Sequence, residues 1–237
     1  LALDRNNITD PSPLTNLTSL SSLALGGNVG LTDCTVLSNL TNLASLSLRE
    51  SSIEDLSILG GLTRLTYLDL YNVPVRNLSP LTNLASLSRL DLSWDSAVTN
   101  CAVLGGSTSL TNLYLRGIAI TNASFLANLY RLSFLNLDST RLTNASPLGG
   151  LTNLSYLSMT GNGAITNISV LSSLTGLVNL ELRANSISNV AFMSSLTRLG
   201  YADLAYNNIT DISPLAGLTN LNSLVLAGNP TINYTGL

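Results

Sequence analysis

The chain has 237 residues, of which 45% are hydrophobic and 10% are charged, and its formal net charge is −3. It contains neither lysine nor histidine, so all ten basic residues are arginine. This composition argues against a surface that follows nucleic-acid phosphates. It also excludes the imidazole groups that serve most general bases and many zinc sites.

A unit of 22 or 23 residues repeats along the whole chain. Its clearest copy, Leu199 to Asn220, fits L-x-x-L-x-L-x-x-N-x-I-x-D-x-S-x-L-x-x-L-x-x once leucine fills the second slot. The pattern falls within the leucine-rich repeat, whose period is roughly 20 to 29 residues. In chain order, the first leucines of successive units are Leu20, Leu43, Leu65, Leu87, Leu110, Leu132, Leu154, Leu177, Leu199 and Leu221.

Each unit is too small to bury its own leucines, so neighbouring units must cover them. The segment x-L-x-L-x predicts a short strand with its leucines inward and the intervening residues on the opposite face. We therefore expect an α/β solenoid: a parallel β-sheet on a concave face, loops and short 3₁₀ segments on a convex face, and little regular α-helix. In this fold Leu68, Leu90 and Leu135 should be buried.

A longer period of 67 residues, equal to three units, lies over the short one. It is visible at residues that the repeat leaves free, such as Arg49, Arg116 and Arg183, and it indicates duplication of a three-unit block. We predict one solenoid over residues 1–237 with about eleven units. Because both ends fall within a unit, we expect the sequence to be a window of a longer chain.

The asparagine slot of the repeat is filled unevenly. Asparagine occupies it in six units, whereas Ser51, Val73, Asp95, Ile118 and Thr140 replace it in the middle of the chain. Val73 and Ile118 cannot satisfy backbone groups of adjacent turns, so we expect local irregularity near them.

Two segments carry a resemblance to a known family. NNITDISPLAGLTNL at Asn207 to Leu221 and RNLSPLTNLASL at Arg76 to Leu87 resemble internalin-type bacterial leucine-rich repeats. The resemblance covers essentially the whole chain. It implies surface display and binding of a protein partner through the concave face.

The sequence contains little that would support catalysis. The paired glycines, such as Gly26-Gly27 and Gly60-Gly61, mark turns, and no phosphate-binding loop or nucleophile elbow is present. We therefore predict no enzyme activity, no cofactor and no metal site. No apolar run is long enough to cross a membrane, and no signal peptide is visible.

The two cysteines, Cys34 and Cys101, occupy an inward apolar slot three units apart. They should be too far from each other for a disulfide, which closes only when the two Cα atoms are within about 7 Å. We expect buried free thiols that behave as small hydrophobic groups.

N-x-S/T sequons recur because the repeat itself writes asparagine or aspartate at a turn. In a bacterial protein they would carry no sugar, whereas in a eukaryotic secretory protein they would be acceptors. The candidates for glycosylation are Asn7, Asn16, Asn39, Asn77, Asn122, Asn144, Asn153, Asn167, Asn208 and Asn233.

The expected concave face holds eight of the twelve aromatic residues. Tyrosine, tryptophan and arginine among short polar residues are typical of interface anchors. The early positions Ser22, Ala24 and Gly26 are bland by comparison. The candidate binding residues are Tyr67, Asp69, Tyr71, Arg89, Asp91, Trp94, Tyr114, Arg116, Phe134, Asp138, Tyr156, Arg183, Tyr201 and Asp203.

A structural interpretation of the same residues remains open. Aromatic and opposite-charge pairs on adjacent strands stabilise a sheet, as Arg183 near Glu181 and Asp203 would. Like charges one strand apart, such as Asp69 and Asp91, would be screened by Arg89 or would hold a cation.

Three hypotheses follow. The first is a non-enzymatic extracellular module that recognises or adheres to a protein or glycan through the concave face. The second is a structural, N-glycosylated repeat protein that assembles with neighbouring chains into a fibre or surface layer. The third is an intracellular scaffold. The absence of lysine and the low charge favour an extracellular or cell-surface location.

Overall fold

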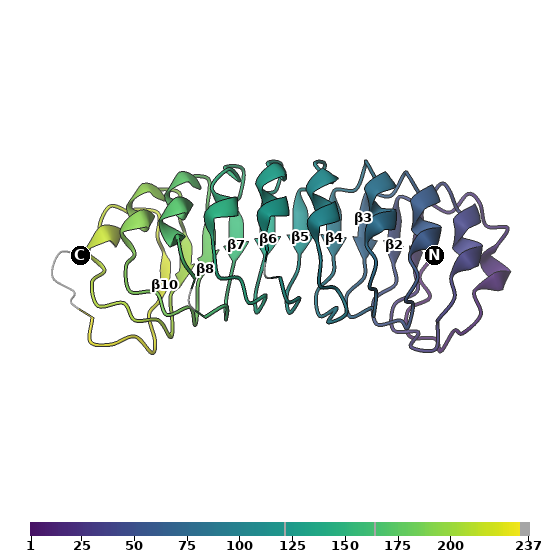
Figure 1. Ribbon diagram of the computed structural model, residues 1–237, viewed down its shortest axis with the longest axis horizontal. Coiled ribbons are helices and arrows are strands. Elements are labelled where there is room, and N and C mark those ends of the chain that lie inside the picture. The colour runs from purple at the N-terminus through teal and green to yellow at the C-terminus, as the bar shows by residue number, and fades with distance from the viewer. Residues whose placement is uncertain (121, 164, 233–237) are drawn as a thin grey trace. The chain divides into compact units, whose positions relative to one another are not determined.

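The computed structural model describes residues 1–120, 122–163 and 165–232 and contains two compact units, Leu1–Ile118 and Ala119–Leu237. Within each unit, short parallel strands lie on one side of the coils and 3₁₀ turns, labelled η, lie on the other (Figure 1). No α-helix occurs among the described residues. The predicted leucine-rich-repeat fold is confirmed, whereas one continuous solenoid over 1–237 stays a prediction.

The first unit contains strands β1 to β5, and neighbouring strands pair in parallel with their central leucines aligned. Leu68 on β3, for example, lies opposite Leu46 on one side and Leu90 on the other. In chain order the elements are η1 (Ser12–Leu14), β1 (Ser22–Ala24), η2 (Thr35–Asn39), β2 (Ser45–Ser47), η3 (Ser57–Gly61), β3 (Tyr67–Asp69), η4 (Ser79–Asn83), β4 (Arg89–Asp91), η5 (Ala102–Gly106) and β5 (Asn112–Tyr114).

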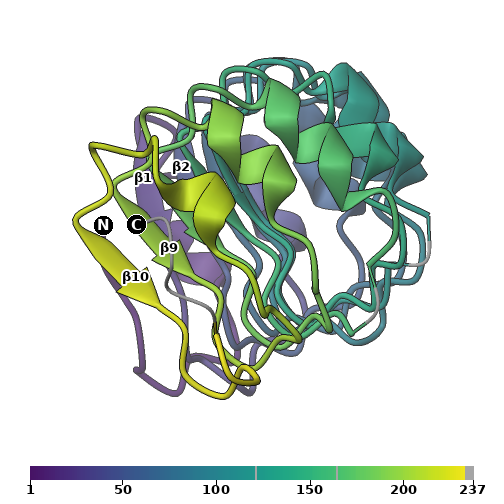
Figure 2. The same ribbon diagram turned by 90° about the vertical axis from the view of Figure 1, so that its left-hand side faces the viewer.

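The second unit repeats this arrangement with β6 to β10, again parallel and in register. Figure 2 looks along this unit and shows β9 beside β10, with the 3₁₀ turns across the coil from them. Its elements are η6 (Ser124–Asn128), β6 (Phe134–Asn136), η7 (Ser146–Leu148), β7 (Tyr156–Ser158), η8 (Ile168–Ser173), β8 (Asn179–Glu181), η9 (Ala191–Ser195), β9 (Tyr201–Asp203), η10 (Ser213–Leu215) and β10 (Ser223–Val225).

The core of each unit is a set of stacked leucines. Leu68, Leu90 and Leu135 are all 0% exposed, as predicted. Full burial of one such side chain stabilises the fold by about 2 kcal/mol. Cys34 and Cys101 belong to this core as free thiols, and burial raises the pKa of both to about 12.

The 3₁₀ turns begin at a side-chain hydrogen bond whose aspartate or asparagine acceptor recurs along the sequence. The backbone N–H of Ser57 donates to Asp55 Oδ1 at 2.8 Å, and the N–H of Ser79 donates to Asn77 Oδ1 at 2.9 Å. An aspartate or asparagine that accepts from the residue two positions later fixes the turn locally. This requirement explains why N-x-S sequons occur so often in this chain.

A ladder of buried amides ties each coil to the next. Asn162 Oδ1 accepts from the N–H groups of Thr140 and Leu142, in the preceding coil, at 2.9 and 3.0 Å. Its Nδ2 donates to the carbonyls of Leu137 and Met159, both at 2.8 Å. One side chain therefore satisfies four backbone groups that would otherwise be buried without partners.

The ladder is interrupted at Val73, where irregularity was predicted. The hydroxyl of Ser51, one coil earlier, is the buried side-chain polar atom without a partner among the described residues. By contrast, Thr140 Oγ1 fills the same slot and donates to Asn162 Oδ1 at 2.9 Å. The N–H of Val75 also donates to the carbonyl of Val73 in a tight turn at 2.7 Å. The prediction is confirmed at Val73, and at Ile118 it stays a prediction.

Asp95 fills the same slot with a carboxylate. It is 1% exposed and accepts from the N–H groups of Val75 at 3.2 Å and Ala97 at 3.1 Å. Burial nevertheless raises the pKa of Asp95 to about 6, because these N–H donors compensate only part of the lost hydration.

We predict that Val73→Asn stabilises the protein by about 1 kcal/mol, because the new amide would offer Ser51 an acceptor. The free energy of unfolding in urea measures this effect. The opposite substitution, Asn162→Val, is the control and should cost roughly 3 kcal/mol, because three donors of the preceding coil lose their acceptor. Destabilisation by Val73→Asn would contradict the prediction.

We predict that Asp95→Asn stabilises the protein at pH 7 by up to about 3 kcal/mol and much less at pH 4. The pKa in the folded state, about 6, is above the ordinary value of 3.8. The folded protein therefore binds more protons between these values, and stability falls as pH rises from about 4 through about 6. Urea unfolding across that window should show this decline in the unsubstituted protein and not in the variant.

Candidate functional site

The candidate site is the side of each unit on which the strands lie, which we call the strand face. It is formed by the two strand residues that flank the buried central residue, and by the two residues that follow the third leucine of the repeat, such as Leu70. It corresponds to the predicted concave positions. In the first unit Tyr67 and Asp69 flank Leu68 on β3, and Arg89 and Asp91 flank Leu90 on β4. Strand pairing sets each of these residues beside its equivalent on the next strand.

Arginine and aromatic side chains stack on each other across this face in the first unit. The guanidinium carbon of Arg89 lies 5.4 Å from the ring centre of Tyr67 and 4.9 Å from that of Tyr114. Arg49 lies over Tyr71 at 4.8 Å. These contacts are within the range of cation–π attraction.

The aspartate side chains on the strand face of the first unit are buried or half-buried against the sheet. Asp69 is 6% exposed and accepts from the Ser47 hydroxyl at 3.1 Å and from the N–H of Tyr71 at 3.0 Å. Asp91 accepts from the N–H of Ser93 at 2.8 Å. Burial raises the pKa of Asp91, and the neighbouring charge of Asp69 adds to the effect.

Trp94 and Tyr206 occupy a backbone position with positive φ, 64° and 54° respectively. Each ring covers the glycine of the next coil: an added Cβ would lie 2.6 Å from Trp94 at Gly117 and 2.7 Å from Tyr206 at Gly228. The two side chains are 44% and 55% exposed, and most other coils use smaller or polar residues in this slot. Positive φ recurs at the equivalent position of other coils, for example at Glu50, Asn72 and Ser139, so the conformation belongs to the repeat. Bulky residues rarely adopt it, which makes the two rings unusual occupants of this slot.

In each unit an arginine packs on the exposed ring. Arg116 lies over Trp94 at 5.2 Å, and Arg183 lies over Tyr206 at 4.4 Å. The sequence alone left open an ion-pair ladder around Arg183. Among the described residues, however, the ion pair is between Arg49 and Glu50, at 3.5 Å, and Arg183 instead stacks on an aromatic ring.

The second unit has a more acidic strand face. Phe134 and Tyr156 stack in parallel at 4.2 Å, and the Tyr156 hydroxyl donates to Glu181 Oε1 at 2.9 Å. The Ser158 hydroxyl donates to Asp138 Oδ1 in a short hydrogen bond. Burial, with the hydrogen bond to Glu181, raises the pKa of Tyr156 well above its usual range.

Tyr201 and Asp203 flank the central residue of β9, and Glu181 lies directly opposite Asp203 on β8. Asp203 Oδ1 accepts from the N–H of Ala205 at 2.9 Å. No group of three or more candidate metal ligands occurs among the described residues. The predicted binding residues thus lie on the strand faces of their units, and their role in binding stays a prediction.

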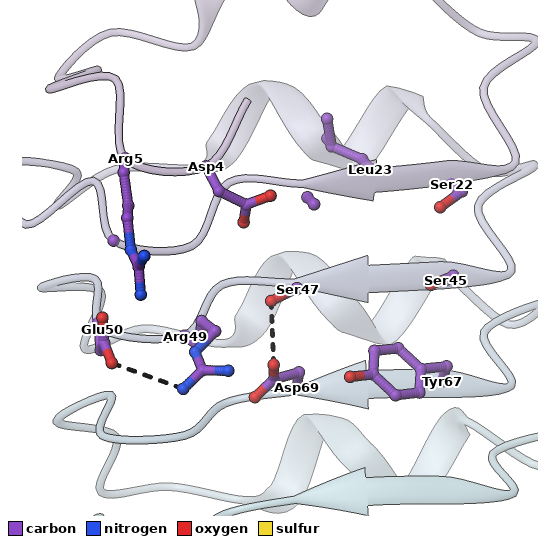
Figure 3. Close-up of a pocket in the computed structure, with 12 residues that line it drawn as sticks. Asp4, Arg5, Ser22, Leu23, Ser45, Ser47, Arg49, Glu50, Tyr67 and Asp69 are labelled. Carbon is purple, nitrogen blue, oxygen red and sulfur yellow. Dashed lines mark hydrogen bonds and ion pairs between the residues drawn. The ribbon is translucent and has the colours of Figure 1, made fainter. Parts of the chain in front are cut away.

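A hollow of about 420 Å³ lies on the strand face of the first unit (Figure 3). Ser22, Ser45 and Ser47 form part of its lining because their small side chains leave the face open. The sequence analysis did not predict this hollow, because it is formed by small residues such as Ser22 and Ala24, which have no distinctive chemistry in the sequence. Its other lining residues include Asp4, Arg5, Arg49, Glu50, Tyr67 and Asp69.

The sequon asparagines within the described residues are all exposed, and Asn233 lies outside those residues. Two of them already use the nitrogen that would carry a sugar. Asn153 Nδ2 donates to the carbonyl of Tyr130 at 2.7 Å, and Asn167 Nδ2 donates to Asn144 Oδ1 at 3.0 Å. Glycosylation itself stays a prediction.

Comparisons with known proteins agree with this geometry. A family model described as Leucine Rich repeats (2 copies) matches residues 130–173 and 197–237. No curated protein matches the sequence. The described part of the chain has no helix long and apolar enough to cross a membrane.

Solved structures give more detail. An internalin, InlF, from Listeria monocytogenes is 29% identical with a TM-score of 0.92, over 98% of this chain and 67% of that chain. Internalin C2 from the same organism is 30% identical with a TM-score of 0.76, over 95% of this chain and 99% of that chain. The plant peptide hormone receptor RGFR1, in complex with RGF2, is 22% identical with a TM-score of 0.70, over 94% and 42%, which shows the shared fold alone.

The repeat, the parallel strands and the amide ladder define this chain as a leucine-rich-repeat protein. More specifically, it belongs to the internalin-type family of these proteins.

We predict that Gly117→Ala shifts the fluorescence of Trp94, the single tryptophan, and costs about 1–2 kcal/mol of stability. The added methyl group would displace the ring from its position under Arg116. Gly163→Ala is the matched control, because Gly163 also has positive φ, at 77°, but no atom lies within 4 Å of its added Cβ. Equal emission spectra for the two variants would contradict the packing described here.

Proposed function

We propose that the chain is a non-enzymatic, extracellular recognition module that binds a protein partner through the strand face. The observation that carries the proposal is the pair of exposed rings, Trp94 in the first unit and Tyr206 in the second, each with an arginine stacked on it. A sheet gains stability from cross-strand pairs with no need to leave a tryptophan 44% and a tyrosine 55% exposed. Such residues are the usual anchors of protein interfaces.

The fold relatives support recognition as the general role. The structure of RGFR1 holds a peptide hormone, so this architecture can bind a peptide. A surface without lysine, low in charge and rich in serine, threonine and asparagine, supports an extracellular location. The hydrogen bonds of Asp69, Asp138 and Glu181 satisfy these carboxylates within the sheet, which argues against a role in acid–base catalysis.

A second candidate is a structural, N-glycosylated repeat protein that assembles into a fibre or surface layer. The exposure of the described sequon asparagines favours it. Glycan recognition by the strand face is a further alternative, because sugars also stack on exposed rings. We favour a protein partner because arginine accompanies the exposed rings.

We predict that replacing Tyr67, Trp94, Phe134 and Tyr201 with serine weakens the binding of peptides selected from a random library at least thirtyfold. Loss of interface anchors removes packing area that serine cannot replace. Surface plasmon resonance with immobilised protein measures the affinities, and circular dichroism checks the fold.

Tyr130→Ser is the control, because Tyr130 is 53% exposed but lies between η6 and β6, away from the strand face. It should leave the affinity within twofold of the original. Binding that survives the fourfold substitution, or that is equally sensitive to Tyr130→Ser, would refute recognition by the strand face. Assembly into filaments that persists in the fourfold variant would instead favour the structural candidate.

A further inference from the structure

Arg89 is held differently from the other arginines of the first unit. Its guanidinium lies between two rings, Tyr67 on the preceding strand at 5.4 Å and Tyr114 on the following strand at 4.9 Å. Arg49 and Arg116 each lie over one ring. The two rings therefore restrict the side chain of Arg89 before any ligand binds, which lowers the entropy cost of binding.

Arg89 is also exposed and has no acidic partner within the described residues. The ion pair found among the described residues joins Arg49 to Glu50 at 3.5 Å and does not involve Arg89. Asp91 itself accepts from the N–H of Ser93, and no described carboxylate lies within 4.0 Å of the Arg89 guanidinium. The positive charge of Arg89 is consequently available to a ligand.

The guanidinium of Arg89 lies over a ring from each neighbouring strand, and the residue is exposed. Its N–H groups lie in the plane of the guanidinium and are its hydrogen-bond donors, so they are the part that an acceptor on a partner would meet. Two parallel N–H groups match the two oxygens of a carboxylate. We propose that Arg89, clamped between Tyr67 and Tyr114, binds a carboxylate on an aspartate or glutamate of the protein partner.

This inference rests on the proposed function and adds the chemistry of the partner. Asp69 and Asp91 lie one strand apart in the sheet beneath this position. They disfavour a polyanion such as an acidic glycan, whose many charges would be repelled, more than a single acidic side chain. Beside Tyr67 the serine-lined hollow leaves room for adjoining residues of a peptide (Figure 3).

The test is an NMR titration of the Arg89 Nε–H signal with a blocked pentapeptide that has one glutamate between serine and glycine residues. We expect a saturable shift, and at least fivefold weaker binding of the same peptide with glutamine. Arg89→Gln should lose the preference for glutamate, and Arg89→Lys should not restore it because lysine lacks the planar fork.

Two further sets of variants separate this role from general charge and stability. Arg76→Gln removes an equally exposed arginine that lies on the loop before η4, and it should leave the preference unchanged. Joint substitution of Tyr67 and Tyr114 with alanine should weaken binding about threefold, whereas joint substitution with phenylalanine should not, because the rings would remain.

Equal binding of the glutamate and glutamine peptides would overturn the inference, and so would equal effects of Arg89→Gln and Arg76→Gln. Tighter binding of a hyaluronan tetrasaccharide than of the glutamate peptide would also overturn it, in favour of a glycan. The fourfold serine variant keeps Arg89 and is measured with library-selected peptides, so failure of recognition by the strand face and failure of this carboxylate anchor give different results.

Discussion

The structure depends on burial that no coil can achieve by itself. A three-residue strand such as β3 would have both edges unpaired if its coil stood alone. Its central leucine becomes inaccessible to solvent only when adjacent coils align in register, as β3 and β4 do. Hydrophobic burial therefore requires exact stacking, because a slip of one residue would turn every leucine toward solvent. Parallel pairing and the leucine core are thus consequences of one constraint.

The buried amides solve the problem that this stacking creates. Stacked coils place backbone N–H and carbonyl groups inside each unit, and Asn162 shows how one side chain satisfies groups of two coils. Where the slot holds Val73, the Ser51 hydroxyl has no partner among the described residues, and where it holds Asp95, the pKa of the buried carboxyl group is raised. The free energy gained by leucine burial elsewhere in the core offsets the cost of these local defects.

The strand face is free of these demands, and its composition is consequently informative. Tyr67, Arg89 and Tyr114 satisfy no core requirement, yet strand register places them in a single stack. Exposed rings at strained backbone positions, as at Trp94, add to the same surface. The proposed recognition by this face rests on these residues, because the leucine core does not require them.

The sequence by itself determined the repeat, the strand positions, the inward leucines and the face on which each candidate residue lies. These features depend on periodicity, which a linear pattern records completely. It also located the interrupted ladder at Val73, because valine has no polar atom to offer.

Only the tertiary structure decided which side chains touch. Arg183 stacks on Tyr206 rather than pairing with an acid, and Arg89 lies between two rings, because side-chain rotamers and the relative height of neighbouring coils set these contacts. The hollow beside Tyr67 arises from small residues that carry no signal in the sequence. Contacts between residues about 22 positions apart thus arise from the stacking of coils. The repeat spacing predicts which coils are adjacent, but it does not predict which side chains touch.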